Sequence, residues 1–391
     1  MKILQVIPAF YPAHGYGGGP RVVYEISKRL VKKGHEVIVY TTDADDKHSR
    51  FTTLFRCIDG IEVYYFKNIS NSLAFEHKIF LSPGMVSMLA KSLKNFDIIH
   101  IHDTRTIQSI ITYYFAKMYG IPYVLQPHGT LTSQTNTKKG AKRNFDLFFG
   151  NKILRNAIRA ILLNKTEAEK CLEMGLNEAQ NKIIPNGIDL STYRDLPEKG
   201  TFKEKYRIDI NQPIILYLGR IHESKGIDLL VRAFAELFVR LDHVKLVIVG
   251  PDDGYLSALK DLVILLNLND KVLFTGAISE NDKIAAYLDS DVFVTPSFYG
   301  FPLTFLEAMA CGVPIITTKK GDFIEGIDNE IGYVVEYNDL ELENALFKIL
   351  SDDELRERFK RNAKEKINEF DWNSIVDRIE QVYKEGTEKS S

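Results

Sequence analysis

Two cations in the second half of the chain stand where a phosphate could bind. Arg220 and Lys225 lie in Tyr217–Gly226, which links an apolar strand pattern to the helix pattern that begins at Ile227. In open α/β sheets, ligands bind at the loops that follow the strands. Two cations beside a helix N-terminus can stabilise the charge that develops on a phosphate leaving group. The alternative is a basic loop that only faces water.

Residues 296–318 combine a strand end, a tight Gly-Phe-Pro-Leu turn, a short helix and a new strand. Pro302 suits the first turn of a helix, and Gly312 suits the left-handed residue that follows a helix. The N-terminus of this helix would therefore open at the carboxyl edge of a sheet and favour an anion. Glu307 lies among apolar helix residues, and a ligand hydroxyl could serve as its partner. The alternative is an ordinary helix-capping turn with a tolerated glutamate.

This stretch strongly resembles the donor-binding signature of glycosyltransferase family 4, a family of retaining transferases with GT-B architecture. In that family two glutamates, with seven residues between them, frame a Gly-Phe-Gly-Leu-type turn. The second corresponds to Glu307, which the resemblance implies holds the ribose hydroxyls of the donor. The first corresponds to Tyr299 and the second glycine to Pro302, and both departures concern how the transferred sugar is held. The donor-binding set that the resemblance implies is Tyr299, Gly300, Phe301, Pro302, Leu303 and Glu307.

Two features of the first half complete the candidate site. Gly18 and Gly19 belong to a glycine-rich loop between the first strand pattern and a helix that starts at Pro20. Such a loop lets the backbone approach a ligand closely, although it can also be a simple tight turn. His128 follows the strand pattern Tyr123–Gln126 and could bind a sugar hydroxyl or, if protonated, a phosphate. It is similar to the cleft histidine of the family, and a purely structural histidine is the alternative.

Two other polar clusters suggest metal sites less convincingly. His100, His102 and Asp103 lack a fourth ligand at a usual spacing, so we expect the alternating histidines to cap a sheet edge. Asp43, Asp45 and Asp46 form an Asp-x-Asp pattern that we expect to be a solvated loop. No metal and no cofactor beyond the donor substrate is predicted.

Composition limits the class of protein. The chain has 391 residues, 45% hydrophobic and 26% charged, with a net charge of −2. This length suits two domains, and the charge gives no general attraction to nucleic acid. The three cysteines are far apart, which is typical of a reducing cytosol. The N-terminus reads as a buried strand and not as a signal peptide or anchor, so a cytoplasmic protein is predicted.

Strand and helix patterns alternate along the whole chain. They predict an α/β protein with two doubly wound, Rossmann-like parallel-sheet domains. We place an N-terminal acceptor-side domain at 1–188 and a donor-binding domain at 189–371. The resemblance implies that these face a central cleft, and that a final helix at 372–391 packs back on the first domain.

The segment Lys138–Arg159 departs from the rest of the chain. It holds seven basic residues and one acidic residue, interleaved with apolar and aromatic ones. A basic, apolar helical segment suits an anionic lipid surface, at the inner face of a membrane. A surface helix that docks its apolar face on the core fits the pattern equally well.

Taken with these features, the resemblance implies a retaining, metal-independent glycosyltransferase. It would move a sugar from a nucleotide-diphosphate sugar to a hydroxyl of a glycan or lipid-linked acceptor. Two alternatives remain open: a nucleotide-sugar 2-epimerase of the same architecture, and a non-catalytic glycan- or lipid-binding relative.

Overall fold

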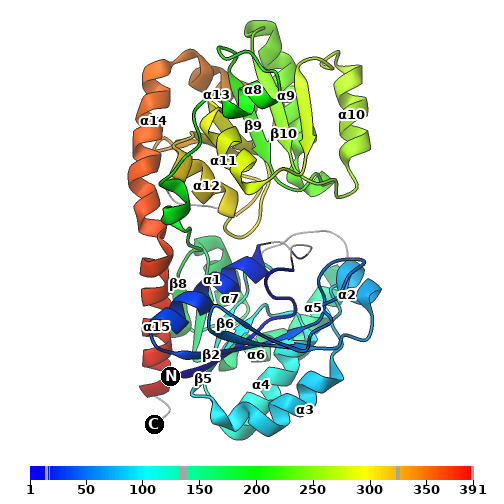
Figure 1. The fold of residues 1–391 in the computed structure, drawn as a ribbon, viewed down its shortest axis with the longest axis vertical. Coiled ribbons are helices and arrows are strands. Elements are labelled where there is room, and N and C mark those ends of the chain that lie inside the picture. Colours follow the sequence, from blue (N-terminus) through cyan, green and yellow to red (C-terminus); the bar gives the residue numbers. More distant parts are fainter. Residues whose placement is uncertain (14–15, 17, 132–138, 323–325, 389–391) are drawn as a thin grey trace. The chain divides into compact units, whose positions relative to one another are not determined.

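The computed structural model of the protein describes residues 1–13, 16, 18–131, 139–322 and 326–388. The chain forms two compact units. Unit 1 comprises Met1–Gly187 together with Trp372–Ser391, and unit 2 comprises Ile188–Asp371. Figure 1 labels many of the elements of both. Each unit is described by itself below.

An eight-stranded sheet forms the centre of unit 1, in the order β3-β4-β2-β1-β5-β6-β7-β8. All neighbouring pairs are parallel except β3 with β4. The strands are β1 (Lys2–Val6), β2 (Glu36–Thr42), β3 (Phe55–Ile58), β4 (Ile61–Phe66), β5 (Ile98–His102), β6 (Tyr123–Gln126), β7 (Arg159–Leu162) and β8 (Asn181–Ile183). The strand order reverses direction between β1 and β5, so the loops that follow these two strands leave the sheet side by side.

The helices of unit 1 flank this sheet. They are α1 (Gly19–Lys32), α2 (Asn71–His77), α3 (Pro83–Ser92), α4 (Ile107–Tyr119), α5 (Lys139–Phe145), α6 (Asn151–Asn156), α7 (Lys165–Glu173) and α15 (Trp372–Glu388). A π-helical turn, Asp146–Gly150, joins α5 to α6. β1 and β5 are almost wholly buried because helices cover both faces of a parallel sheet.

Unit 2 holds a six-stranded parallel sheet in the order β11-β10-β9-β12-β13-β14. The strands are β9 (Ile214–Leu218), β10 (Lys245–Val249), β11 (Val272–Gly276), β12 (Val292–Thr295), β13 (Ile315–Thr318) and β14 (Gly332–Val335). The helices are α8 (Thr201–Lys205), α9 (Ile227–Arg240), α10 (Leu256–Leu265), α11 (Glu280–Leu288), α12 (Leu303–Cys311), α13 (Asp339–Ser351) and α14 (Asp353–Lys366). The order reverses between β9 and β12, which is the Rossmann pattern of a doubly wound sheet. The predicted pair of parallel-sheet α/β domains is confirmed.

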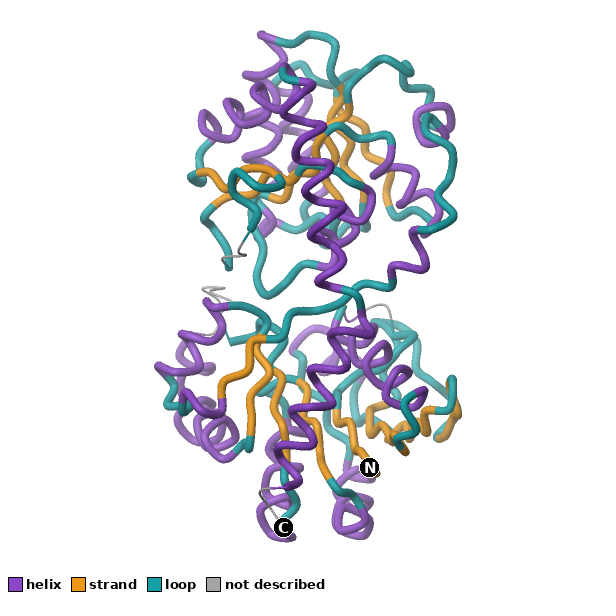
Figure 2. Tube along the Cα trace, turned by 90° about the vertical axis from the view of Figure 1, so that its left-hand side faces the viewer, coloured by secondary structure: helices purple, strands orange, loops and turns teal. Residues whose placement is uncertain are grey.

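The last helix of the chain belongs to unit 1. Helix α15 packs on α1 and on β5, β6 and β7, and Figure 2 shows it crossing the strands of that sheet. Ile379 and Tyr383 on its inner face are buried. Gly187 lies against the ring of Trp372, where a Cβ atom would stand only 2.6 Å from the ring. Only glycine fits there. Since unit 1 ends at Gly187 and resumes at Trp372, this contact is where the chain leaves and re-enters the unit.

Two further observations concern an edge strand of unit 1 and the length of the helices. The antiparallel edge strand β3 was not predicted, because it alternates exposed and half-buried residues without a continuous apolar run. Across the described residues, no helix combines the length and the apolar character needed to cross a bilayer.

Candidate active site

Arg220 and Lys225 lie at the reversal point of the second sheet. Strand β9 ends at Leu218, and the loop that follows contains Arg220 and the short 3₁₀ helix Glu223–Lys225 before α9 begins. Arg220 is exposed, and its Nη1 atom lies 2.5 Å from Oδ2 of Asp253. Lys225 is half-buried, and burial together with the charge of Arg220 lowers its pKa. Among the described residues, Lys225 has no hydrogen-bond acceptor, so its ammonium group is available to a ligand anion.

The turn at residues 298–302 leaves the neighbouring strand β12 on the same edge of the sheet. Gly300 has a positive φ of 77°, and its amide donates to Oδ2 of Asp322 at 2.7 Å. Phe301 is buried against Phe370, with 5.5 Å between ring centroids. Tyr299 is half-buried. These contacts hold the Gly-Phe-Pro-Leu turn in one shape beside the loop that contains Arg220.

Helix α12 begins one residue later than predicted. Pro302 is the N-cap and Leu303 the first helical residue, and no side chain caps this end. Gly312 takes the left-handed conformation predicted for it, with φ 72°. The uncapped N-terminus of α12 therefore presents backbone N–H groups at the edge of the sheet.

Glu307 already has partners within the protein. Its Oε1 lies 2.6 Å from Nζ of Lys283, and its Oε2 accepts from the hydroxyl of Tyr287 at 3.1 Å. This carboxylate therefore does not depend on a ligand hydroxyl for a partner, although one was expected to serve. Sequence could not reveal these partners because both lie on α11, a turn and a strand away. A ribose could still use the remaining lone pairs of the carboxylate.

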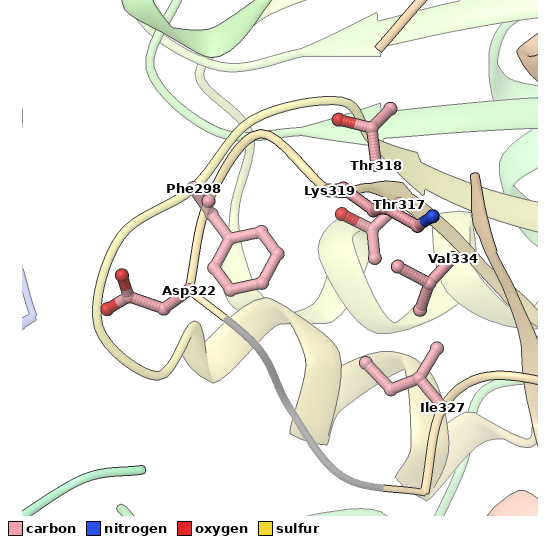
Figure 3. Close-up of a pocket in the computed structure, with 8 residues that line it drawn as sticks. Phe298, Thr317, Thr318, Lys319, Asp322, Ile327 and Val334 are labelled. Carbon is pink, nitrogen blue, oxygen red and sulfur yellow. The ribbon is translucent and has the colours of Figure 1, made fainter. Parts of the chain in front are cut away.

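A small pocket adjoins this turn at the ends of β12 and β13. Its volume is about 110 Å³, and its lining is Phe298, Thr317, Thr318, Lys319, Gly321, Asp322, Ile327 and Val334. Figure 3 shows the ring of Phe298 facing the apolar side chains, whereas the carboxylate of Asp322 points away from them. The pocket lies behind the candidate donor turn and is mostly apolar.

In unit 1, the glycine-rich loop follows β1 at the reversal point of the first sheet. Gly18 is the N-cap of α1 and Gly19 its first residue, and no side chain caps this end either. Neither glycine has a positive φ, and that of Gly18 is −78°. A Cβ atom on Gly19 would meet open space. Their value is therefore an open approach to the helix N-terminus and not an unusual backbone conformation.

His128 follows β6 in a turn that buried groups hold rigidly. It adopts the left-handed conformation, with φ 57°. The next amide, of Gly129, donates to Oε1 of Glu167 at 2.6 Å, and the hydroxyl of Thr130 donates to Oδ1 of Asp103 at 2.9 Å. Desolvation lowers the pKa of His128 to about 4. The imidazole is therefore neutral at neutral pH, which favours a sugar hydroxyl over a phosphate as its ligand.

The expectations for the two weaker clusters were wrong in part. His100 and His102 do not cap a sheet edge: both are completely buried in the central strand β5 and belong to a hydrogen-bonded chain. Asp43 is buried and accepts from the amide of Asn68 at 2.8 Å, so only the end of the Asp-x-Asp loop is solvated. Within the described part of the chain, no three His, Cys, Asp or Glu residues gather as a metal site.

The basic segment is helical from Lys139 to Asn156, as predicted, whereas Arg159 already belongs to strand β7. Leu147 and Phe148, at the π-helical turn, are 64% and 60% exposed. Ile153 and Leu154 are buried in the core, and Arg159 is also buried. Lys138 lies outside the described residues. The segment therefore combines a core-docked half with an exposed apolar tip.

Two family models together match most of the chain. Residues 198–366 match the model of Glycosyl transferases group 1, and residues 16–192 match that of Glycosyltransferase Family 4. The chain belongs to this glycosyltransferase family. The matches contain the candidate residues of both units, from Gly18 to Glu307.

Named relatives agree with this assignment. An uncharacterized glycosyltransferase of Methanocaldococcus jannaschii is 28% identical over 390 residues, which cover 96% of each chain. The UDP-Gal:alpha-D-GlcNAc-diphosphoundecaprenol alpha-1,3-galactosyltransferase of Escherichia coli is 27% identical over 338 residues, 83% of this chain and 84% of that one. The structure of sucrose-phosphate synthase from Thermosynechococcus elongatus superimposes with a TM-score of 0.81 at 23% identity and covers 98% of both chains. The fold of this glycosyltransferase is therefore GT-B.

Proposed function

We propose that this enzyme is a retaining glycosyltransferase that uses a nucleotide-diphosphate sugar and no metal ion. The acceptor is a hydroxyl of a glycan or of a lipid-linked saccharide. The observation that carries the proposal is the placement of Arg220 and Lys225 beside the uncapped N-terminus of α12. The loop with the two cations follows β9, and the N-terminus of α12 follows β12. These two strands are adjacent and parallel at the reversal point of one sheet. Two cations and a helix terminus suit a diphosphate leaving group.

The proposed reaction forms one bond and breaks one bond on the same face of the sugar. The acceptor oxygen bonds to the anomeric carbon as the bond from that carbon to the diphosphate breaks. The acceptor proton passes to the departing phosphate oxygen, and Arg220 and Lys225 stabilise the negative charge that remains on the diphosphate. The configuration at the anomeric carbon is retained.

The carboxylates near His128 support this route over a covalent intermediate. Asp103 accepts from the amide of Thr104 and the hydroxyl of Thr130. Glu167 accepts from the amides of Gly129 and Leu163. Both are committed to holding the turn around His128, so neither is placed as a free nucleophile.

A lipid-linked acceptor is the finer part of the proposal. It is supported by the E. coli relative, whose name gives an undecaprenol-linked acceptor. It is also supported by the exposed side chains of Leu147 and Phe148 beside the basic residues Lys142, Arg143 and Lys152. We infer a reversible contact of this surface with the inner face of an anionic membrane. Three free cysteines fit a reducing, cytoplasmic compartment.

A donor panel tests the proposed function. The purified enzyme is incubated with UDP-, GDP- and ADP-sugars, with and without saccharide and lipid-linked acceptors, and the products are analysed by mass and NMR. The expected product is a glycoside with the anomeric configuration of the donor, formed in the presence of EDTA. A new sugar nucleotide without acceptor would identify an epimerase, and binding without any product would identify a non-catalytic relative. An inverted glycoside, or activity lost with EDTA, would overturn the mechanism.

A further inference from the structure

A chain of buried polar side chains leads from the last helix to His128. The hydroxyl of Tyr383 lies 2.6 Å from Nδ1 of His100 and 3.3 Å from Nε2 of Gln5. Oε1 of Gln5 lies 2.6 Å from Nε2 of His102. Nδ1 of His102 lies 2.9 Å from Nε2 of His128. Gln5, His100, His102 and Tyr383 are all completely buried.

A row of polar side chains in the core is unfavourable for the stability of the fold unless each of them is hydrogen-bonded. Gln5 and the two histidines occupy β1 and β5, whose other residues are apolar except for Lys2 at the start of β1. A buried polar group destabilises the fold unless it is hydrogen-bonded, and apolar residues would fill the same space at less risk. The chain ends at the candidate ligand-binding residue His128, which suggests that it serves that residue.

The donors and acceptors in this chain can be ordered from the amide of Gln5. Its Oε1 can only accept, so the proton of neutral His102 lies on Nε2. Nδ1 of His102 is then a bare acceptor, and Nε2 of His128 must donate to it. Because burial lowers the pKa of both histidines, each carries one ring proton. Nδ1 of His128 is left with an unprotonated lone pair, and none of the residues that the structure describes donates a hydrogen bond to it.

We propose that Gln5 and His102 are positioning residues that hold His128 in its Nε2–H form, so that Nδ1 accepts a hydrogen bond from a substrate hydroxyl. The inference rests on the proposed function for the identity of that ligand. A bare ring nitrogen attracts a hydroxyl proton and repels a phosphate oxygen. His128 would therefore select and orient a sugar hydroxyl.

NMR of the full-length protein labelled with ¹⁵N-histidine tests the ordering directly, at pH 7.5. Long-range ¹H–¹⁵N correlations report which ring nitrogen is protonated, and His128→Gln assigns the signals by their loss. We expect a single Nε2–H form for His128 and for His102. A His128 signal protonated at Nδ1, or a mixture of both forms, would overturn the proposal. This measurement needs no turnover, so it stands even if the proposed function fails.

Matched variants test the consequence for catalysis. His102→Leu removes the acceptor and should give mixed forms of His128, with kcat/KM at least tenfold lower and unchanged affinity for the free nucleoside diphosphate. His102→Gln keeps one acceptor and one donor and should recover activity to within about threefold of wild type. His100→Leu removes an equally buried histidine of the same strand, whose ring contacts that of His102 but which is hydrogen-bonded to Tyr383 and not to Gln5, His102 or His128. It should therefore leave the NMR signals that report the ring protonation of His128 unchanged. Equal losses of activity in His100→Leu and His102→Leu would show that burial alone matters and would sink the idea.

Discussion

The ammonium group of Lys283 lies 2.6 Å from Oε1 of Glu307, and both side chains are at most 13% exposed. Lys283 also pairs with Glu280 at 2.7 Å, whereas Glu307 accepts its other hydrogen bond from the hydroxyl of Tyr287. Lys283 thus has a second carboxylate, but Glu307 has no second cation among its described contacts. The two residues of this ion pair therefore differ in that Lys283 keeps a partner of opposite charge when the pair is broken, and Glu307 does not.

This inequality predicts different effects for the two residues. Lys283→Met leaves a buried carboxylate without a cation and should lower the free energy of unfolding by about 3–5 kcal/mol. Glu307→Gln leaves Lys283 paired with Glu280, so it should cost less in stability but weaken binding of the nucleoside diphosphate. Urea unfolding and calorimetry measure the two effects. Glu343→Gln, which removes a buried paired carboxylate of α13, is the control and should leave nucleotide affinity unchanged. Undiminished affinity in Glu307→Gln would make Glu307 purely structural.

Arg220 and Lys225 are expected to act on the leaving group. Either Ala variant should lower turnover by at least roughly tenfold, because a charged hydrogen bond contributes about 1.5–3 kcal/mol. Arg232→Ala, which removes an exposed cation of α9, provides the control. Circular dichroism checks folding, and donor turnover is the readout. A folded double variant with full turnover would remove both residues from the mechanism.

Tyr299 stands where the family has a carboxylate, and it should influence the choice of donor sugar. A phenol offers one hydroxyl and a ring face, whereas a carboxylate can accept from two sugar hydroxyls. Tyr299→Glu should therefore change the ratio of rates between donor sugars, measured in competition. Tyr299→Phe separates the hydroxyl from the ring. If all donors slow by the same factor, position 299 does not contact the sugar.

The surface around Leu147 and Phe148 should bind anionic vesicles. Each basic residue near such a surface adds about 1 kcal/mol, so replacing Lys138, Lys139, Lys142 and Arg143 by Ser should abolish most binding. Leu147→Ser with Phe148→Ser should weaken binding even at low salt, because it removes apolar insertion. Co-sedimentation with phosphatidylglycerol and with phosphatidylcholine vesicles is the measurement. The control is Leu265→Ser, at an exposed apolar residue of α10. Binding that ignores lipid charge or salt would contradict this prediction.

The buried histidines should make the fold sensitive to acid. Desolvation lowers the pKa values of His100 and His102, and that of His128 to about 4, below the ordinary value of 6.5. Below pH 6.5 the unfolded chain therefore binds more protons than the folded one, and stability falls as pH falls. Urea unfolding between pH 7.5 and 4.5 should show a shallower decline in His128→Gln than in wild type. His243→Gln, at an exposed position, should keep the full decline. Identical slopes in all three proteins would refute the prediction.

Much of the fold could be predicted because buried parallel strands are continuous apolar runs. Ile3–Ile7 was expected and β1 spans Lys2–Val6; Tyr123–Gln126 is β6 without any shift. The short edge strand β8 escaped because its residues are only partly buried. An edge strand has one neighbour and little burial, so its sequence carries a weaker pattern.

Less of the candidate site could be predicted from the sequence. Gln5 and His102 did carry a signal, since each is a polar residue within a buried strand of mainly apolar residues. Their relationship could not be predicted, because they lie 97 positions apart, and His100 lies 283 positions from Tyr383. Only the strand order, with β1 beside β5, brings them together. The pairing of Glu307 with Lys283 depends in the same way on how α11 packs on α12.

The placement of α15 on unit 1 has a consequence for the order of events during synthesis. Unit 2 is continuous in sequence, so it can fold once Asp371 has left the ribosome. Unit 1 must wait for Trp372 to cover Gly187 and for Tyr383 to meet Gln5, which is among the earliest residues made. Most multidomain chains complete their N-terminal domain first. Here the first half emerges early and remains without its covering helix while the whole of unit 2, Ile188–Asp371, is translated, so its final packing is completed last.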